Sequence, residues 1–172
     1  MPTEIYMSVE HPDDGVITEE CCSKESIGAF YKENHDEECL VVGYDHRVSV
    51  PTSKVSGQVT GTRKHEYLQI TKLIDKASPE LLKAVTHPSE LEVEISFYRT
   101  PDETSAGEMV HYYTITLERA KVVSVDYCSP NIIDPRFDDY VPYENVNFTY
   151  GKINVTHEIC TTTHDDDSAE KG

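Results

Sequence analysis

The stretch that decides the fold is residues 43–85, GYDHRVSVPTSKVSGQVTGTRKHEYLQITKLIDKASPELLKAV. Its first eight residues alternate between an apolar or aromatic face and a polar face, which predicts a half-buried strand that ends at Pro51. Residues 52–63 show no hydrophobic period, and apolar residues resume at 67–73 as a second strand. The stretch therefore predicts two strands joined by an unusually long hairpin loop, at about residues 52–64.

A short helix follows the second strand. Ser78 is a candidate N-cap, and Pro79 suits the first helical position because it has no amide hydrogen to satisfy there. Pro88 closes the segment, so we expect a helix over about residues 79–86. The side chains expected to cover apolar surface of the strands are Leu81, Leu82 and Val85.

The rest of the chain alternates in the same manner. Further strands are expected at residues 5–9, 39–43, 91–97, 113–117, 122–127, 146–150 and 153–155. Many short strands with a single helix predict a mainly β fold, an antiparallel barrel or sandwich with one flanking helix. We expect one domain over residues 1–158. Residues 159–172 are polar and acidic, which predicts a mobile C-terminal tail.

The long loop is the first feature that calls for a functional reason, since most hairpin loops have two to five residues. At this point the sequence resembles the Hcp (haemolysin-coregulated protein) family, the tail-tube subunits of the bacterial type VI secretion system. The segments that carry the resemblance are VPT at 50–52, SGQVTGTR at 56–63, ITKLIDKASPELLKAV at 70–85, FYRT at 97–100, HYYTITLERAKVVSV at 111–125 and YGKINVTHE at 150–158. The order and spacing of these segments make the resemblance specific.

The resemblance implies a structural subunit without catalytic activity or cofactor. It implies hexameric rings that stack into a tube, a VgrG-type spike and a sheath as partners, effectors in the lumen, and export of the subunit from the bacterial cytoplasm. The loop resembles the family's extended loop, which reaches toward a neighbouring ring. The residues expected to take part in stacking are Lys54, Ser56, Gly57, Gly61, Arg63 and Lys64. The acidic N-terminal region is the candidate partner of the three basic ones.

Charge excludes some functions. The net charge of −17 argues against nucleic acid, which needs clusters of Lys and Arg to neutralise phosphates. Residues 1–47 carry 12 acidic and 3 basic side chains, whereas residues 48–100 carry 6 acidic and 7 basic side chains.

The N-terminus shows neither a secretory leader nor a membrane span, so we expect synthesis in the cytoplasm and no membrane insertion. Five cysteines, an odd number, suit free thiols in a reducing compartment.

The sequence contains only weak signals for a metal-binding or catalytic site. His35 and Cys39 have a usable spacing for zinc but supply two of the four ligands that a closed site needs. Asp165, Asp166 and Asp167 lack the glycine and distal glutamate of a calcium loop. Cys21 and Cys22 lie among glutamates, which disfavours a reactive thiolate. The sequence therefore predicts no enzyme. The alternative function is a carbohydrate- or protein-binding β-sandwich module, for which eleven tyrosines leave room although tryptophan is absent.

Overall fold

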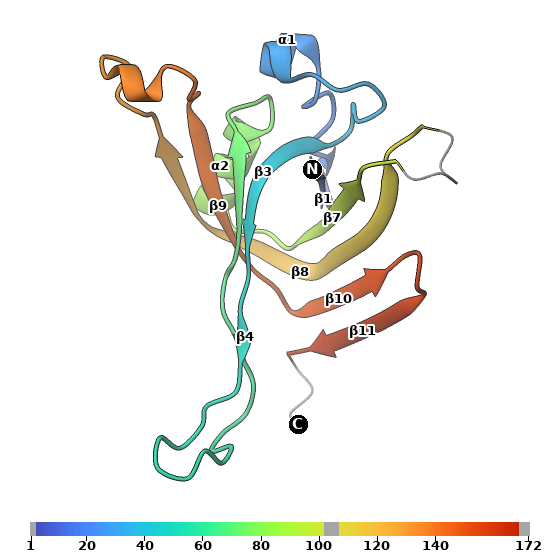
Figure 1. The fold of residues 1–172 in the computed structure, drawn as a ribbon, viewed down its shortest axis with the longest axis vertical. Helices are drawn as coiled ribbons and strands as arrows, with labels where there is room; N and C mark the ends of the chain where they lie inside the picture. The colour runs from blue at the N-terminus through green and yellow to red at the C-terminus, as the bar shows by residue number, and fades with distance from the viewer. Residues whose placement is uncertain (1–2, 102–106, 169–172) are drawn as a thin grey trace.

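The strands pair in an antiparallel sheet that closes on itself. The computed structural model describes residues 3–101 and 107–168. Within them the sheet runs in the order β11-β10-β8-β7-β1-β3-β6-β9, and an additional pairing of β8 with β9 closes the strands from β8 to β9 into a barrel (Figure 1). β10 and β11 continue the sheet outside the barrel, and β2 pairs with β1. The fold is thus the antiparallel β-barrel that the sequence predicts.

The elements of the described residues are, in chain order, β1 (Glu4–His11), β2 (Gly15–Val16), α1 (Lys24–Ile27), the 3₁₀ turn η1 (Gly28–Phe30), β3 (Cys39–Asp45), β4 (Val48–Ser49), β5 (Lys64–His65), β6 (Leu68–Leu73), α2 (Ser78–Thr86), β7 (Leu91–Arg99), β8 (Val110–Cys128), the 3₁₀ turn η2 (Pro135–Phe137), β9 (Tyr143–Thr149), β10 (Lys152–His157) and β11 (Thr162–Asp167).

β8 is the strand that closes the barrel. The sequence predicts two strands at 113–117 and 122–127, but the structure has a single strand of 19 residues. Residues 110–120 pair with β7, and residues 121–128 pair with β9. Arg119, at φ 53° in the left-handed region, lies where the partner changes. One bent strand therefore joins both ends of the sheet.

Alternate residues of the strands fill the interior. In β7, Leu91, Val93 and Ile95 are buried while Glu92 and Glu94 are exposed, which confirms the period-two reading. The same core contains side chains of β1, β3, β6, β8, β9, β10 and α2.

The helix α2 packs against β8 and contributes to this core. Leu81 is fully buried and Val85 is partly buried against the core, as predicted. The prediction for Leu82 is wrong, because this side chain is 44% exposed. Ala84 is buried instead. Residues 81, 84 and 85 lie at i, i+3 and i+4 on one helix face, and Leu82 lies off that face.

The start of α2 also differs from the prediction. Ala77, not Ser78, is the N-cap, and no side chain caps the helix. Ser78 is buried; its hydroxyl accepts a hydrogen bond from the Asp75 amide at 3.0 Å and donates one to Glu144 Oε1 at 2.9 Å. The serine is therefore part of an interior polar cluster. A second helix, α1, which was not predicted from the sequence, lies before β3, and the side chain of Ser23 caps it.

The C-terminal segment requires the largest correction. Residues 159–172 were expected to form a mobile tail, but Thr162–Asp167 form β11, which pairs with β10 along its whole length. Residues 169–172 lie outside the described residues. The run of three aspartates thus belongs to the sheet. Within the described residues, no helix has the length and apolar character needed to cross a membrane.

The two neighbouring leucines of α2 provide a stability test. Leu81→Ala should lower the free energy of unfolding by about 2–5 kcal/mol, because it removes a fully buried side chain from a packed core. Leu82→Ala should change it by less than about 0.5 kcal/mol, because that side chain is largely exposed. Urea denaturation followed by circular dichroism measures both. Equal losses in the two variants would contradict this assignment of the helix face.

Candidate functional site

The most prominent surface feature is a hairpin (residues 46–67) that leaves the barrel and extends along the long axis of the molecule (Figure 1). Its base is the β4–β5 pair, and a further bridge joins Thr52 to Val59. Beyond this bridge the amide of Ser53 donates to the carbonyl of Gln58 at 2.8 Å. The long loop predicted at 52–64 is therefore a hydrogen-bonded ribbon, and only residues 54–57 form the turn at its tip.

Local hydrogen bonds shape the tip. The Ser53 hydroxyl accepts from the amides of Val55 and Ser56, both at 3.3 Å, and Gly57 adopts φ 69°, a conformation that favours glycine. Lys54 is exposed, and Val55 is 98% exposed. The tip thus presents a cation and an apolar side chain to whatever it contacts.

The residues predicted for ring stacking do not all share one location. Lys54, Ser56 and Gly57 lie at the tip, and Lys64 is exposed in β5. Gly61 does not adopt a positive φ; a Cβ there would lie 3.4 Å from Pro51 Cγ, in ordinary contact.

Arg63 lies at the hairpin base and is bound within its own chain. Its Nε donates to Asp166 Oδ2 at 2.5 Å, and its Nη2 donates to the carbonyl of Asp167 at 3.0 Å. The guanidinium of Arg63 therefore has partners within one chain, and its contact with a neighbouring copy stays a prediction. Sequence reasoning missed its partner because more than a hundred residues separate the two side chains.

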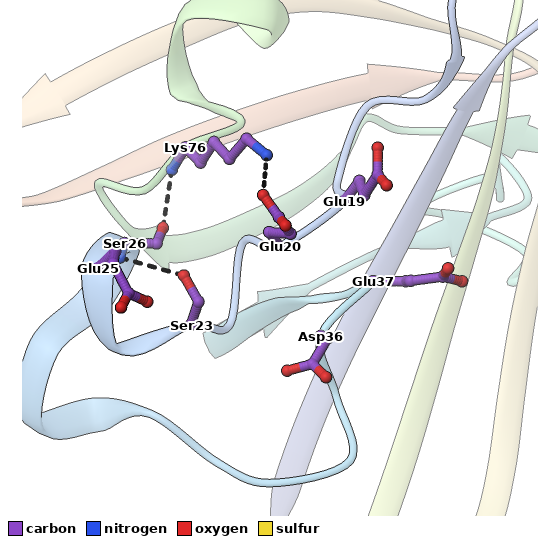
Figure 2. Close-up of a pocket in the computed structure, with 8 residues that line it drawn as sticks. All are labelled: Glu19, Glu20, Ser23, Glu25, Ser26, Asp36, Glu37 and Lys76. Atoms are coloured by element: carbon purple, nitrogen blue, oxygen red, sulfur yellow. Dashed lines mark hydrogen bonds and ion pairs between the residues drawn. The ribbon is translucent and has the colours of Figure 1, made fainter.

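An acidic cleft of about 880 Å³ surrounds α1, at the end of the long axis opposite the hairpin (Figure 1). The residues that line it are Glu19, Glu20, Ser23, Glu25, Ser26, Asp36, Glu37 and Lys76 (Figure 2). Five carboxylates against one ammonium make the cleft strongly negative at neutral pH.

Lys76 holds one wall of the acidic cleft together. Its Nζ lies 2.6 Å from Glu20 Oε2, and its backbone amide donates to the Ser26 hydroxyl at 2.9 Å (Figure 2). The hydrogen bond from Lys76 keeps the pKa of Glu20 below its usual value, so this carboxylate stays ionised under mildly acidic conditions. The dashed contacts in Figure 2 involve neither Glu37 nor Asp36, whose exposed carboxylates remain turned to solvent.

A second cluster of charges lies inside the barrel. Lys72 Nζ lies 2.7 Å from both Asp75 Oδ1 and Glu144 Oε1, and these side chains are at most 1% exposed. Lys72 and Glu144 face each other across β6 and β9. Burial alone would lower the pKa of Lys72, but the nearby Cys39, Asp75 and Glu144 raise it above its usual value, so the ammonium stays charged. The cluster is closed to solvent, and its contacts join β6, β9 and the start of α2.

Two thiols lie beside this charge cluster. The Sγ atoms of Cys21 and Cys39 and a carboxylate oxygen of Asp75 lie within 4.8 Å of one another. The ammonium of Lys72 already provides the cation next to Asp75, so the donor set does not suit a further positive ion. Burial raises the pKa of the Cys39 thiol, which disfavours the thiolate that a metal would need.

His35 and Cys39, a pair with a usable spacing for zinc that the sequence does not predict as a site, have separate surroundings. The ring of His35 stacks on Tyr6, with 3.6 Å between ring centroids, and its Nδ1 lies 2.5 Å from Glu38 Oε2. Cys39 instead lies in the interior with Cys21. The histidine therefore covers Tyr6, which is fully buried although it lies on the outward face of β1.

The buried charge cluster provides a second stability test. Lys72→Met should cost roughly 3–5 kcal/mol, because it leaves two carboxylates in the interior without their cation. Lys121→Met is the matched control: its partner Glu90 lies 3.7 Å away at the surface, and exposed pairs contribute about 0–1 kcal/mol. Chemical denaturation at pH 7 measures both losses. A Lys72→Met protein as stable as the control would show that the cluster is not a structural element.

A closed antiparallel barrel with a projecting hairpin at one end and an acidic cleft at the other is the architecture to compare with known proteins. The model of the family described as "Type VI secretion system effector, Hcp" matches residues 6–157. The chain belongs to this Hcp family, and it is a tube subunit of the type VI secretion system.

Individual relatives agree with the family match. The chain is 42% identical over 168 residues to the "Major exported protein" of Pseudomonas aeruginosa, covering 97% of this chain and 96% of the relative. A solved structure described as an Hcp protein superimposes with a TM-score of 0.91 at 28% identity, covering 99% of this chain and 100% of that one. The secreted protein Hcp3 from Pseudomonas aeruginosa gives a TM-score of 0.81 at 36% identity, covering 98% and 100%.

Proposed function

We propose that this chain forms six-membered rings that stack head to tail into a hollow tube, with the hairpin of one ring docking at the acidic cleft of the next. The observation that supports this is the position of the two features at opposite ends of the long axis (Figure 1). Lys54 at the tip is complementary in charge to the exposed carboxylates of the cleft.

The charges at the hairpin tip and in the acidic cleft determine whether this contact forms, although the whole chain has a large net charge. Each chain carries −17, so stacked rings repel one another overall. At an ionic strength of about 0.1 M, however, charges more than about 10 Å apart are largely screened. Attraction between the hairpin tip and the cleft acts over a few ångströms and is therefore less affected than the repulsion between whole rings.

The remaining roles concern the assembled tube. We propose that the subunit is exported with the tube, that effectors travel in the lumen, and that a VgrG-type spike and a sheath contact the tube's end and outer surface. The export is supported by the relative named "Major exported protein". We also propose that the subunit is not an enzyme, which is supported by the inaccessibility of the Lys72, Asp75 and Glu144 cluster.

The ring is the first element to test. Native mass spectrometry of the purified chain should give a species of six times the 19.5 kDa of one chain, and negative-stain images should show hollow rings. The interface between neighbouring subunits should bury more than about 1,000 Å² in total, since smaller contacts rarely persist in solution. A protein that stays monomeric at high concentration would contradict the proposal.

Charge reversal tests the stacking contact. Lys54→Glu combined with Lys64→Glu should leave rings intact but prevent tubes. Exposed ion pairs contribute about 0.5 kcal/mol each, so the pairs of Lys54 alone, one from each of the six subunits, sum to about 3 kcal/mol, roughly a hundredfold in the stacking equilibrium. Arg63 is left unchanged because its reversal would break its bond to Asp166. Tube length by electron microscopy is the measurement.

The control and the rescue sharpen this experiment. Lys121→Glu reverses an exposed charge on β8, outside the hairpin, and should leave tubes unchanged. Glu25→Lys with Glu37→Lys, placed in the acidic cleft of the hairpin variant, should restore stacking if the two surfaces meet. Normal tubes in the hairpin variant would contradict the docking role of the hairpin, and a hairpin variant that lacks tubes and is not rescued would exclude the acidic cleft as the docking site.

A further inference from the structure

A chain of side chains connects the base of the hairpin to the C-terminal part of the sheet. Tyr150 lies between β9 and β10, and its hydroxyl lies 2.8 Å from His46 Nε2 and 2.7 Å from His65 Nδ1. His65 Nε2 lies 2.7 Å from Asp166 Oδ2, the oxygen that also accepts from Arg63. The strands β3, β5 and β11 and the β9–β10 connection thus meet at one network.

Asp166 and Tyr150 are the groups that join this network. A carboxylate only accepts, so His65 donates from Nε2 to Asp166 Oδ2. The Tyr150 hydroxyl lies between His65 Nδ1 and His46 Nε2, and which atom donates in each of these two bonds depends on the tautomers of the rings. Burial raises the pKa of Tyr150 to about 12, and burial and the neighbouring His65 lower the pKa of His46. At neutral pH the Tyr150 hydroxyl therefore keeps the proton that it can donate.

The network is shielded from solvent more than an ordinary surface ion pair. The side chains of Arg63, His65 and Asp166 are 28%, 20% and 18% exposed. The hydrogen bond from Arg63 keeps the pKa of Asp166 below its usual value, so the carboxylate remains charged. The edges of His46 and His65 both approach the Tyr150 ring, with centroids 5.8 and 5.5 Å apart.

The hairpin needs such a support because its own structure does not fix its direction. The β4–β5 pair has two residues in each strand, and an isolated two-stranded ribbon is only marginally stable. Val48, Val50, Val55 and Val59 are all more than 40% exposed, so apolar burial does not hold the hairpin against the barrel. Polar contacts at the base have to supply the orientation.

We propose that β11 is a latch that fixes the direction of the hairpin, with Asp166 as the positioning residue that receives both Arg63 and His65. The functional consequence rests on the proposed stacking of rings: a hairpin held in one direction loses less conformational freedom on docking than a mobile one. Tyr150 completes the latch because it joins the hairpin strand β5 to the segment that follows β3.

Hydrogen–deuterium exchange of the full chain tests the latch. Asp166→Ala should make the amides of residues 47–49 and 64–66 exchange at least about tenfold faster, because the hairpin base then opens without the rest of the sheet. The amides of β7, in the barrel, should exchange as in the unchanged protein. Asp165→Ala removes the same charge from an exposed neighbour in β11 and should leave the hairpin unaffected.

A second variant distinguishes the loss of one hydrogen bond in the network from a general unfolding of β11. Tyr150→Phe keeps the aromatic ring and removes only the hydroxyl between the two histidines, and it should also speed exchange at the hairpin base. Unchanged exchange in both Asp166→Ala and Tyr150→Phe would overturn the proposal, as would equal acceleration in Asp165→Ala. All samples are compared in conditions where light scattering gives them the same mass.

Measuring tube formation by the same variants distinguishes the latch proposal from the stacking proposal. Faster exchange with shorter or absent tubes supports both. Faster exchange with tubes of normal length supports the latch and counts against the docking role of the hairpin. Unchanged exchange refutes the latch whatever the tubes do.

Discussion

The structure depends on the closure of the sheet by β8. This strand pairs with β7 along its first part and with β9 along its second, so every strand from β8 to β9 in the barrel has a neighbour on both sides. Closure satisfies the backbone groups that would otherwise form an exposed edge. The bend at Arg119 lets one strand serve both partners. Because the strands of the closed barrel are already paired on both sides, the segments available for binding are those that extend away from the barrel.

Within the described residues β11 forms an outer edge of the sheet, and the composition of this strand suits that position. Three consecutive aspartates place negative charge along the edge, which discourages uncontrolled pairing with other chains. The same aspartates act within the molecule, since Asp166 binds Arg63 and His65 and Asp167 binds Arg119. One short strand thus carries charge that discourages pairing with other chains and, in the proposed latch, supports the hairpin.

The strands, the helix and the hairpin could be predicted because each has a local signal. Alternation located β7, and the serine–proline pair located α2 to within one residue. Leu82 was misplaced because three apolar residues in a helix do not reveal which of them faces the core. β11 was missed because THDDD has no apolar alternation, and its role depends on Arg63 and His65, about a hundred residues earlier. The interior carboxylates escaped notice for the same reason.

The placement of the hairpin and the acidic cleft bears on the kind of assembly that the proposed contact would give. The hairpin and the acidic cleft are different surfaces at opposite ends of the molecule, so a contact between them is heterologous (Figure 1). Such a contact leaves a free hairpin at one end and a free cleft at the other, and stacking along the axis does not close. A ring closes around its axis, but a stack of rings grows until another component occupies its end. In the proposed tube, a spike that covers one end would supply such a limit, and the polarity of the tube would follow from the direction in which β11 holds the hairpin.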